Sequence, residues 1–325
     1  YGAVLSGDGE APPAALRPHV KTGGRADVFV DMRHAWAEEM TVAPSGAVDE
    51  FRRKRARNDY PVMALWEMGL AGLRVPLHDL EDAATRRRME IMADIGHVFQ
   101  VHGYGLPDEA AVALLREHRD LVGALELVLN FEGADAAVPQ IRAITEATGI
   151  PVVLSRVNRK DRAKHAGSRF NHLISHGFTL AEAGELAAFL AGHPGIAAGA
   201  QFAIPRSVAP WDAARQLRAF SDATGCKARL YVRSTDANPA EAFEDDAANA
   251  LRFAEAVLAA TGHGVPVVLD TLDDADRGYF VRTGLVDRRF NPRLAGQVIS
   301  ALVLALAGGR WTAADGDAPV LVGDD

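Results

Sequence analysis

The sequence predicts a single (β/α)₈ barrel, because short apolar runs alternate with segments of helical periodicity along most of the 325 residues. Several runs are almost continuously apolar, as in VVL at 152–154 and VVL at 267–269, which is typical of strands buried on both faces. Eight strand–helix units with right-handed crossovers close most simply into a barrel, and an open doubly wound sheet is the alternative.

Each expected element follows from its own pattern of apolar residues and turn residues. Strands are expected at residues 27–31, 73–77, 98–103, 125–130, 151–157, 197–204, 228–233 and 265–270. Helices are expected at residues 83–95, 108–118, 139–148, 180–191, 211–224, 239–261 and 292–306. Gly96 and Gly225 follow two of these helices, as glycine does where a helix ends in a left-handed residue.

The first 60 residues are the least regular part of the chain, since they combine Pro and Gly with the charged run RRKRAR at 52–57. The first strand could instead be the run at 71–77. We expect an N-terminal extension at 1–25, the barrel at 26–310 and a C-terminal tail at 311–325.

Composition limits the function classes. Hydrophobic residues make up 48% and charged residues 24%, as in a soluble protein with a sizeable core. A net charge of −8 disfavours a nucleic-acid partner, and no apolar run approaches the length of a membrane span. The one cysteine, Cys226, cannot form an internal disulfide, and no signal peptide is visible. We therefore expect a cytoplasmic protein.

Several motifs are absent from the sequence: a GxSxG elbow, a Walker A run, a GxGxxG after a strand and HExxH. Serine hydrolases, P-loop enzymes and nucleotide-dependent dehydrogenases lose support, and nothing requires a cofactor. STDANPAEA, at 234–242, offers no glycine-rich phosphate cup. The expected ligand is a small polar molecule.

Three carboxylates at predicted strand ends are the candidate catalytic groups, because loops after the strands carry the chemistry of this fold. Glu132 follows the fourth strand, Asp236 the seventh and Asp270 the eighth. Each assignment has a simpler alternative. Glu132 could serve merely to cap the next helix, and the charged segment 269–293 could be a solvated loop.

The candidate ligand-binding residues are polar or aromatic side chains at the same strand ends or in the long loops 158–179 and 271–291. Arginine can bind a carboxylate through two N–H groups, histidine can transfer a proton, and aromatic rings can stack on a sugar. They are His102, Asn130, Arg156, Asn158, Gln201, Arg233, Tyr279 and Arg282.

GLVDRRFNPR, at 284–293, resembles the segment that leads into the last helix of retaining glycoside hydrolases of the large (β/α)₈ clan. Asn130 and Glu132 resemble the Asn-Glu pair after the fourth strand of that clan, where the glutamate is the acid/base. In this sequence Phe131 separates the two residues. Arg233, Ser234, Thr235 and Asp236 stand where the clan has its nucleophilic glutamate.

The resemblance and the strand-end carboxylates together favour a carbohydrate-active hydrolase, with Glu132 as acid/base and Asp270 or Asp236 as the second carboxylate. A metal-dependent isomerase or lyase, with Glu132, His102 and Asp270 around a divalent ion, is a second hypothesis. A non-catalytic barrel that binds a ligand or partner through the same face is a third.

Overall fold

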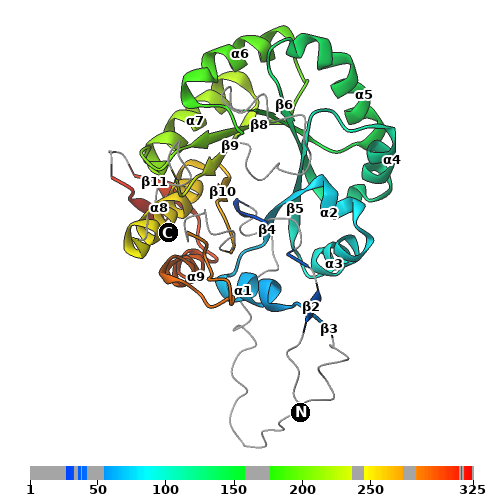
Figure 1. Ribbon diagram of the computed structural model, residues 1–325. Coiled ribbons are helices and arrows are strands. Elements are labelled where there is room, and N and C mark those ends of the chain that lie inside the picture. Colours follow the sequence, from blue (N-terminus) through cyan, green and yellow to red (C-terminus); the bar gives the residue numbers. More distant parts are fainter. Residues whose placement is uncertain are drawn as a thin grey trace, which may run out of the picture.

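In a computed structural model of the protein, eight parallel strands close into a barrel with helices around the outside (Figure 1). The structure describes residues 27–32, 36–37, 39–41, 55–157, 176–235, 245–273, 283–314, 316 and 318–323. In order around the barrel, the strands are β1 (Val28–Asp31), β4 (Gly72–Pro76), β5 (Val98–Tyr104), β6 (Val122–Leu129), β7 (Val152–Arg156), β8 (Gly199–Ile204), β9 (Lys227–Val232) and β10 (Val267–Leu269).

The (β/α)₈ fold predicted from the sequence is confirmed, and the alternative of an open sheet is wrong because β1 pairs with both β4 and β10. All eight predicted strands overlap observed ones. The first strand is the run that ends at Asp31, so the alternative start at 71–77 is also wrong.

The outer layer consists of helices that follow the strands and cover their outward faces. They are α1 (Tyr60–Met68), α2 (Leu77–Glu81), α3 (Ala83–Asp94), α4 (Glu109–Glu117), α5 (Val138–Thr148), α6 (Ala183–Gly192), α7 (Pro210–Thr224), α8 (Asp246–His263) and α9 (Leu294–Leu306), with short 3₁₀ turns at Arg119–Leu121, Ala134–Ala137 and Leu180–Glu182.

Helix ends follow the local chemistry of the sequence. The Asp108 side chain accepts a hydrogen bond from the backbone N–H of Ala111, 2.8 Å away, and so caps the start of α4. Gly225 ends α7 with φ of 71°, a left-handed conformation that glycine adopts without steric cost. The sequence analysis missed α1, although Pro61 in its first turn and Gly69 after its end are the expected helix signals.

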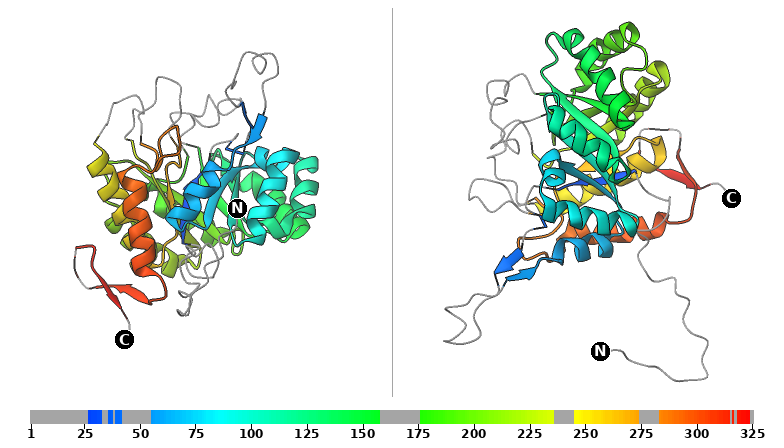
Figure 2. Two further views of the ribbon diagram at one scale, coloured as in Figure 1. Left: turned by 90° about the horizontal axis from the view of Figure 1, so that it is seen from below. Right: turned by 90° about the vertical axis from the view of Figure 1, so that its right-hand side faces the viewer.

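Two small hairpins lie at opposite ends of the barrel (Figure 2). The β2 (Glu39–Thr41) and β3 (Arg55–Arg57) strands form one between β1 and α1. The β11 (Trp311–Ala313) and β12 (Leu321–Gly323) strands form the other, which packs against α8. The predicted extension at 1–25 lies outside the described residues, and the predicted domain boundaries stay predictions. No helix in the described part of the chain is long and apolar enough to cross a membrane.

Strand residues alternate between two kinds of surroundings, which explains the nearly continuous apolar runs. Side chains such as Leu73, Leu154 and Leu230 join the main core between strands and helices. Inside the barrel, a small apolar group that includes Phe29 and Tyr231 lies beside a set of polar and charged side chains. Those polar side chains form the candidate site.

Candidate active site

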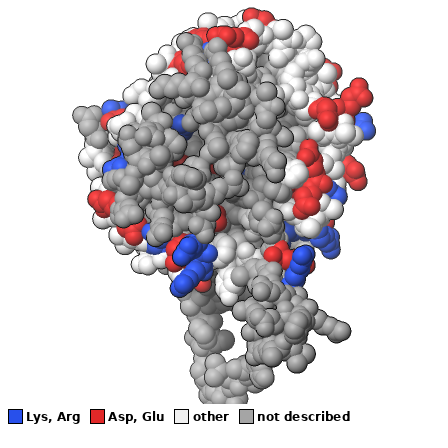
Figure 3. All heavy atoms as spheres, viewed as in Figure 1, with Lys and Arg blue, Asp and Glu red and all other residues white. Residues whose placement is uncertain are grey.

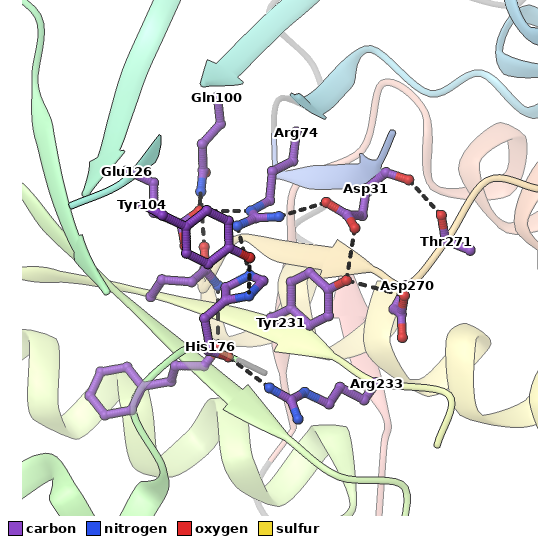
Figure 4. Close-up of polar contacts among 12 residues, drawn as sticks. Asp31, Arg74, Gln100, Tyr104, Glu126, His176, Tyr231, Arg233, Asp270 and Thr271 are labelled. Atoms are coloured by element: carbon purple, nitrogen blue, oxygen red, sulfur yellow. Dashed lines mark hydrogen bonds and ion pairs between the residues drawn. The ribbon is translucent and has the colours of Figure 1, made fainter. Parts of the chain in front are cut away.

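A buried arginine, Arg74 on β4, is the centre of the polar interior (Figure 4). It donates hydrogen bonds to Glu126 on β6, at 2.7 Å, and to Asp31 at the end of β1, at 2.6 Å. Arg74 and Glu126 are both 0% exposed. Burial opposes the charge on Glu126, but attraction to Arg74 and their hydrogen bond outweigh it, so the pKa of Glu126 lies well below its usual value.

Amides extend this network across the barrel. The Gln100 side chain donates to Glu126 at 2.8 Å and to the side-chain amide oxygen of Gln201 at 3.0 Å, and it accepts a hydrogen bond from Arg229. Gln201, a predicted binding residue, is 0% exposed. It therefore supports the floor of the site from within the barrel.

The third partner of Arg74 is His176, where the described chain resumes after Val157. The guanidinium lies 2.7 Å from His176 Nε2, and because arginine has no acceptor, this nitrogen must be the acceptor. The ring proton is then on Nδ1, which lies 3.2 Å from the Tyr104 hydroxyl. Nδ1–H donates to that hydroxyl, so the Tyr104 proton is directed at another acceptor.

Two carboxylates meet at the mouth of the barrel, the end formed by the C-termini of the strands. The Tyr231 hydroxyl lies 2.9 Å from Asp31 and 3.1 Å from Asp270, as the close-up shows (Figure 4). The two carboxylate oxygens are therefore separated by at most the sum of these distances, 6.0 Å. Both aspartates are half-buried, so a ligand in the mouth can reach them.

The other predicted site residues lie in different places. His102 is buried inside the barrel, its ring centroid 6.0 Å from that of His176, and burial together with the nearby Arg74 holds its pKa well below the usual value. Arg233 lies at the mouth after β9. Asn130 and Glu132 are exposed after β6.

Arg156 lies between the sheet and the helix layer rather than at the mouth. It forms ion pairs with Glu182 at 3.3 Å and with Glu185 at 2.9 Å, and its guanidinium lies over the Phe131 ring. Strand alternation explains this position, because Ser155 and Val157 on either side take the inward direction. Four predicted site residues lie outside the described residues: Asn158, Asp236, Tyr279 and Arg282.

The sequence analysis missed the residues that form the centre of the site: Asp31, Arg74, Gln100, Glu126 and Tyr231. A signal was present for Arg74, Gln100 and Glu126. Each is a charged or amide side chain inside an otherwise apolar strand, in RV at 74–75, FQV at 99–101 and LEL at 125–127. Such a side chain is costly to bury unless another polar group satisfies it, so it indicates a paired interior network.

Around the mouth, acidic side chains lie along the edge of the face seen in Figure 3, on the side of α4 and α5 among others.

Within the described ranges, no three His, Cys, Asp or Glu side chains are grouped closely enough to hold a metal ion. Glu132, His102 and Asp270, the ligands of the metal hypothesis, form no such group.

Comparison with known proteins gives a likeness in fold. No family model and no curated protein matches the chain. Among solved structures, the chain is similar to a family 39 glycoside hydrolase from the gut symbiont Bacteroides cellulosilyticus WH2, with a TM-score of 0.58 and 13% identity, over 91% of this chain and 66% of that one. It thus spans about two thirds of that hydrolase.

Two further similar structures have lower scores. A β-galactosidase from the psychrophilic Marinomonas ef1 has a TM-score of 0.46 and 9% identity, over 86% of this chain and 59% of that one. A candidate dihydrodipicolinate synthetase from Pseudomonas aeruginosa has a TM-score of 0.38 and 13% identity, over 75% and 69%. The resemblance to glycoside hydrolase barrels predicted from the sequence is confirmed at the level of fold.

Proposed function

We propose that this protein is a carbohydrate-active hydrolase and that Asp31 and Asp270 are its pair of working carboxyl groups. The observation that carries the proposal is the Tyr231 hydroxyl, which contacts both and limits their oxygens to a separation of 6.0 Å. Retaining glycosidases use two carboxyl groups about 5 to 5.5 Å apart, whereas inverting enzymes need a wider pair. The spacing therefore favours retention.

The surroundings of the two aspartates suggest different roles. One Asp31 oxygen accepts from Arg74 at 2.6 Å and the other from Tyr231 at 2.9 Å, which suits a carboxylate that keeps its negative charge. Asp31 is the proposed nucleophile: its oxygen bonds to the anomeric carbon as the glycosidic C–O bond breaks. Asp270 gives its proton to the leaving oxygen and then takes a proton from the water that releases the sugar.

Glu132 is the alternative acid/base, because it is exposed after β6 at the same mouth. Its role and that of Asp270 are separable by mutation. If Asp270 transfers the proton, Asp270→Asn lowers kcat/KM and Glu132→Gln does not. The reverse result would move the acid/base role to Glu132.

The test is hydrolysis of a panel of aryl glycosides by the purified chain. We expect Asp31→Asn and Asp270→Asn each to lower kcat/KM by about 10² to 10⁴, the contribution typical of a positioned proton-transfer group, or more for the nucleophile. Added formate should partly restore an Asp31→Ala variant, because it can enter the space of the missing carboxylate and attack the anomeric carbon in its place. Asp120→Asn is the matched control, because Asp120 is exposed and precedes β6. Full activity of both site variants would refute the proposal, and no hydrolysis of any glycoside would favour a non-catalytic binding barrel.

A further inference from the structure

Two cations lie at the base of the barrel, the end formed by the N-termini of the strands and opposite the mouth. Lys227 is the first residue of β9, and Arg229 is the third. Successive side chains of a strand point to opposite faces, so these two share a face. Within the described part of the chain, neither forms an ion pair with a carboxylate, Asp27 at the start of β1 included. Two neighbouring cations without a counter-ion indicate a place for an anion.

The Arg229 side chain is held in place by two contacts. One terminal nitrogen, Nη1, donates a hydrogen bond to the Gln100 amide oxygen, and the guanidinium carbon lies 5.5 Å from the centre of the Phe29 ring. These contacts fix the guanidinium before a ligand arrives, so binding costs less entropy. Burial lowers the pKa of Arg229 and attraction to Glu126 opposes this effect, but Glu126 already pairs with Arg74. Among the described residues, the charge on Arg229 is therefore compensated only from a distance.

The remaining edge of the guanidinium, formed by Nε and Nη2, faces solvent. Neither nitrogen has a hydrogen-bond partner among the described residues, yet neither is a buried atom, so both contact solvent. This solvent does not come from the mouth, because Gln100 and Gln201, which lie beside Arg229, are both 0% exposed. It reaches Arg229 from the base. The edge offers two parallel N–H donors, a pair that fits an oxyanion.

Gly199 leaves room beside this edge. It pairs with Lys227 across β8 and β9, and a Cβ at this position would lie 3.9 Å from Arg229 Nε. Because glycine has no side chain, β8 places none against Nε at this level. Lys227 is exposed on the same side, and two residues of a strand span only about 6.6 Å. The flexible lysine side chain can therefore reach an anion that is bound to Arg229.

We propose that Lys227 and Arg229 bind a phosphate group at the base of the barrel, either the free ion or the phosphate of an ester. A phosphate ester carries about −1.5 to −2 charges at pH 7, which two cations balance. A carboxylate would leave one of the cations unpaired. The guanidinium edge binds two phosphate oxygens, and the lysine ammonium, a point charge, binds a third. The site lies at the opposite end of the barrel from Asp31 and Asp270, so it does not depend on the proposed hydrolase.

The test is calorimetric titration of the full chain with inorganic phosphate and with glycerol 3-phosphate. A salt concentration of about 0.1 M limits the repulsion from the net charge of −8 to a range of roughly 10 Å. We expect at least one probe to bind with a dissociation constant of about 1 mM or lower, and acetate, with its single charge, to bind about tenfold more weakly. Tighter binding of inorganic phosphate would identify the free ion as the ligand, and tighter binding of glycerol 3-phosphate would identify an ester.

Variants assign the binding to the two residues. Lys227→Gln leaves the barrel interior undisturbed, because Lys227 is exposed, and it should weaken phosphate binding about tenfold. Arg229→Lys keeps the charge without the paired donors and should weaken binding at least as much. Arg87→Gln, at an exposed position of α3, makes the same change of net charge as Lys227→Gln and should have no effect. Far-ultraviolet circular dichroism checks that each variant is folded.

Three results would overturn this inference: no binding of either phosphate probe, binding no tighter than that of acetate, or an affinity that survives both Lys227→Gln and Arg229→Lys. Arg229 would then serve only to hold Gln100 in place. Because binding is measured without turnover, the outcome is independent of catalysis.

Discussion

Replacing Arg74 with methionine tests whether the barrel interior depends on a single buried cation. Arg74 and Glu126 are both fully buried, so the substitution removes the ion-pair partner of the Glu126 carboxylate and leaves it the Gln100 hydrogen bond at 2.8 Å. Asp31 loses less, because its side chain is 14% exposed and keeps the Tyr231 contact. Stranding one charge of a buried pair costs about 3 to 5 kcal/mol. This is a large part of the roughly 5 to 15 kcal/mol that stabilises most proteins.

The free energy of unfolding, measured by urea denaturation at pH 7, checks this cost. Adding Glu126→Gln to the Arg74→Met variant removes the stranded charge, so the double variant should be more stable than Arg74→Met alone. Arg87→Met removes an ion pair with Glu90 on the surface of α3 and should leave the midpoint nearly unchanged. An Arg74→Met variant no less stable than this control would refute the reasoning.

The effect of pH on the same variant has a definite sign. In the wild type, the low pKa of Glu126 adds stability above the pKa of an unfolded glutamate, near 4.3, and this stability is lost as pH falls toward the folded value. Without Arg74, the strongest interaction that opposes burial is lost, so the balance shifts toward the protonated acid. The deficit of Arg74→Met relative to wild type should therefore be largest at pH 7 and shrink toward pH 4. A deficit that stays constant would contradict a charge-based cause.

Three further predictions concern other buried or constrained residues. Burial lowers the pKa of His97 to about 4. As pH falls from 6.5 toward 4, only the unfolded chain takes up a proton on this residue, so the protein should lose about 3 kcal/mol of stability. A His97→Gln variant should not show this loss. Equal pH slopes in urea titrations would contradict this. Gly177→Ala should destabilise the protein by about 2 kcal/mol or more, because φ is +98° and the new Cβ would lie 2.6 Å from the Ala203 Cβ. At Gly149 a Cβ has space, so Gly149→Ala should destabilise the protein by only about 1 kcal/mol. Thermal unfolding of both variants measures the difference. Arg156→Gln should lower stability by about 1 to 3 kcal/mol and leave sugar binding unchanged, and weaker binding would put this residue back in the site.

Position along a strand was predictable from the sequence, and this explains which site residues were found. Asp270 and Arg233 follow apolar runs, so the rule that loops after strands carry the chemistry selects them. The same rule selected Arg156, which faces the helices instead. A strand end gives the height of a residue in the barrel, but a shift of one residue reverses the direction of its side chain.

The alternation of apolar runs and helical periods determined the barrel, because burial on both faces of a parallel sheet leaves that pattern in the sequence itself. The grouping of Asp31, Arg74, Tyr231 and Asp270 was decided only by the closed tertiary structure. Asp31 and Tyr231 are 200 positions apart, and they meet because closing the barrel brings β1 beside β10 and near β9. The pattern along one strand carries no record of which distant side chain lies opposite it. The sequence therefore specifies the eight strands, and barrel closure specifies the site.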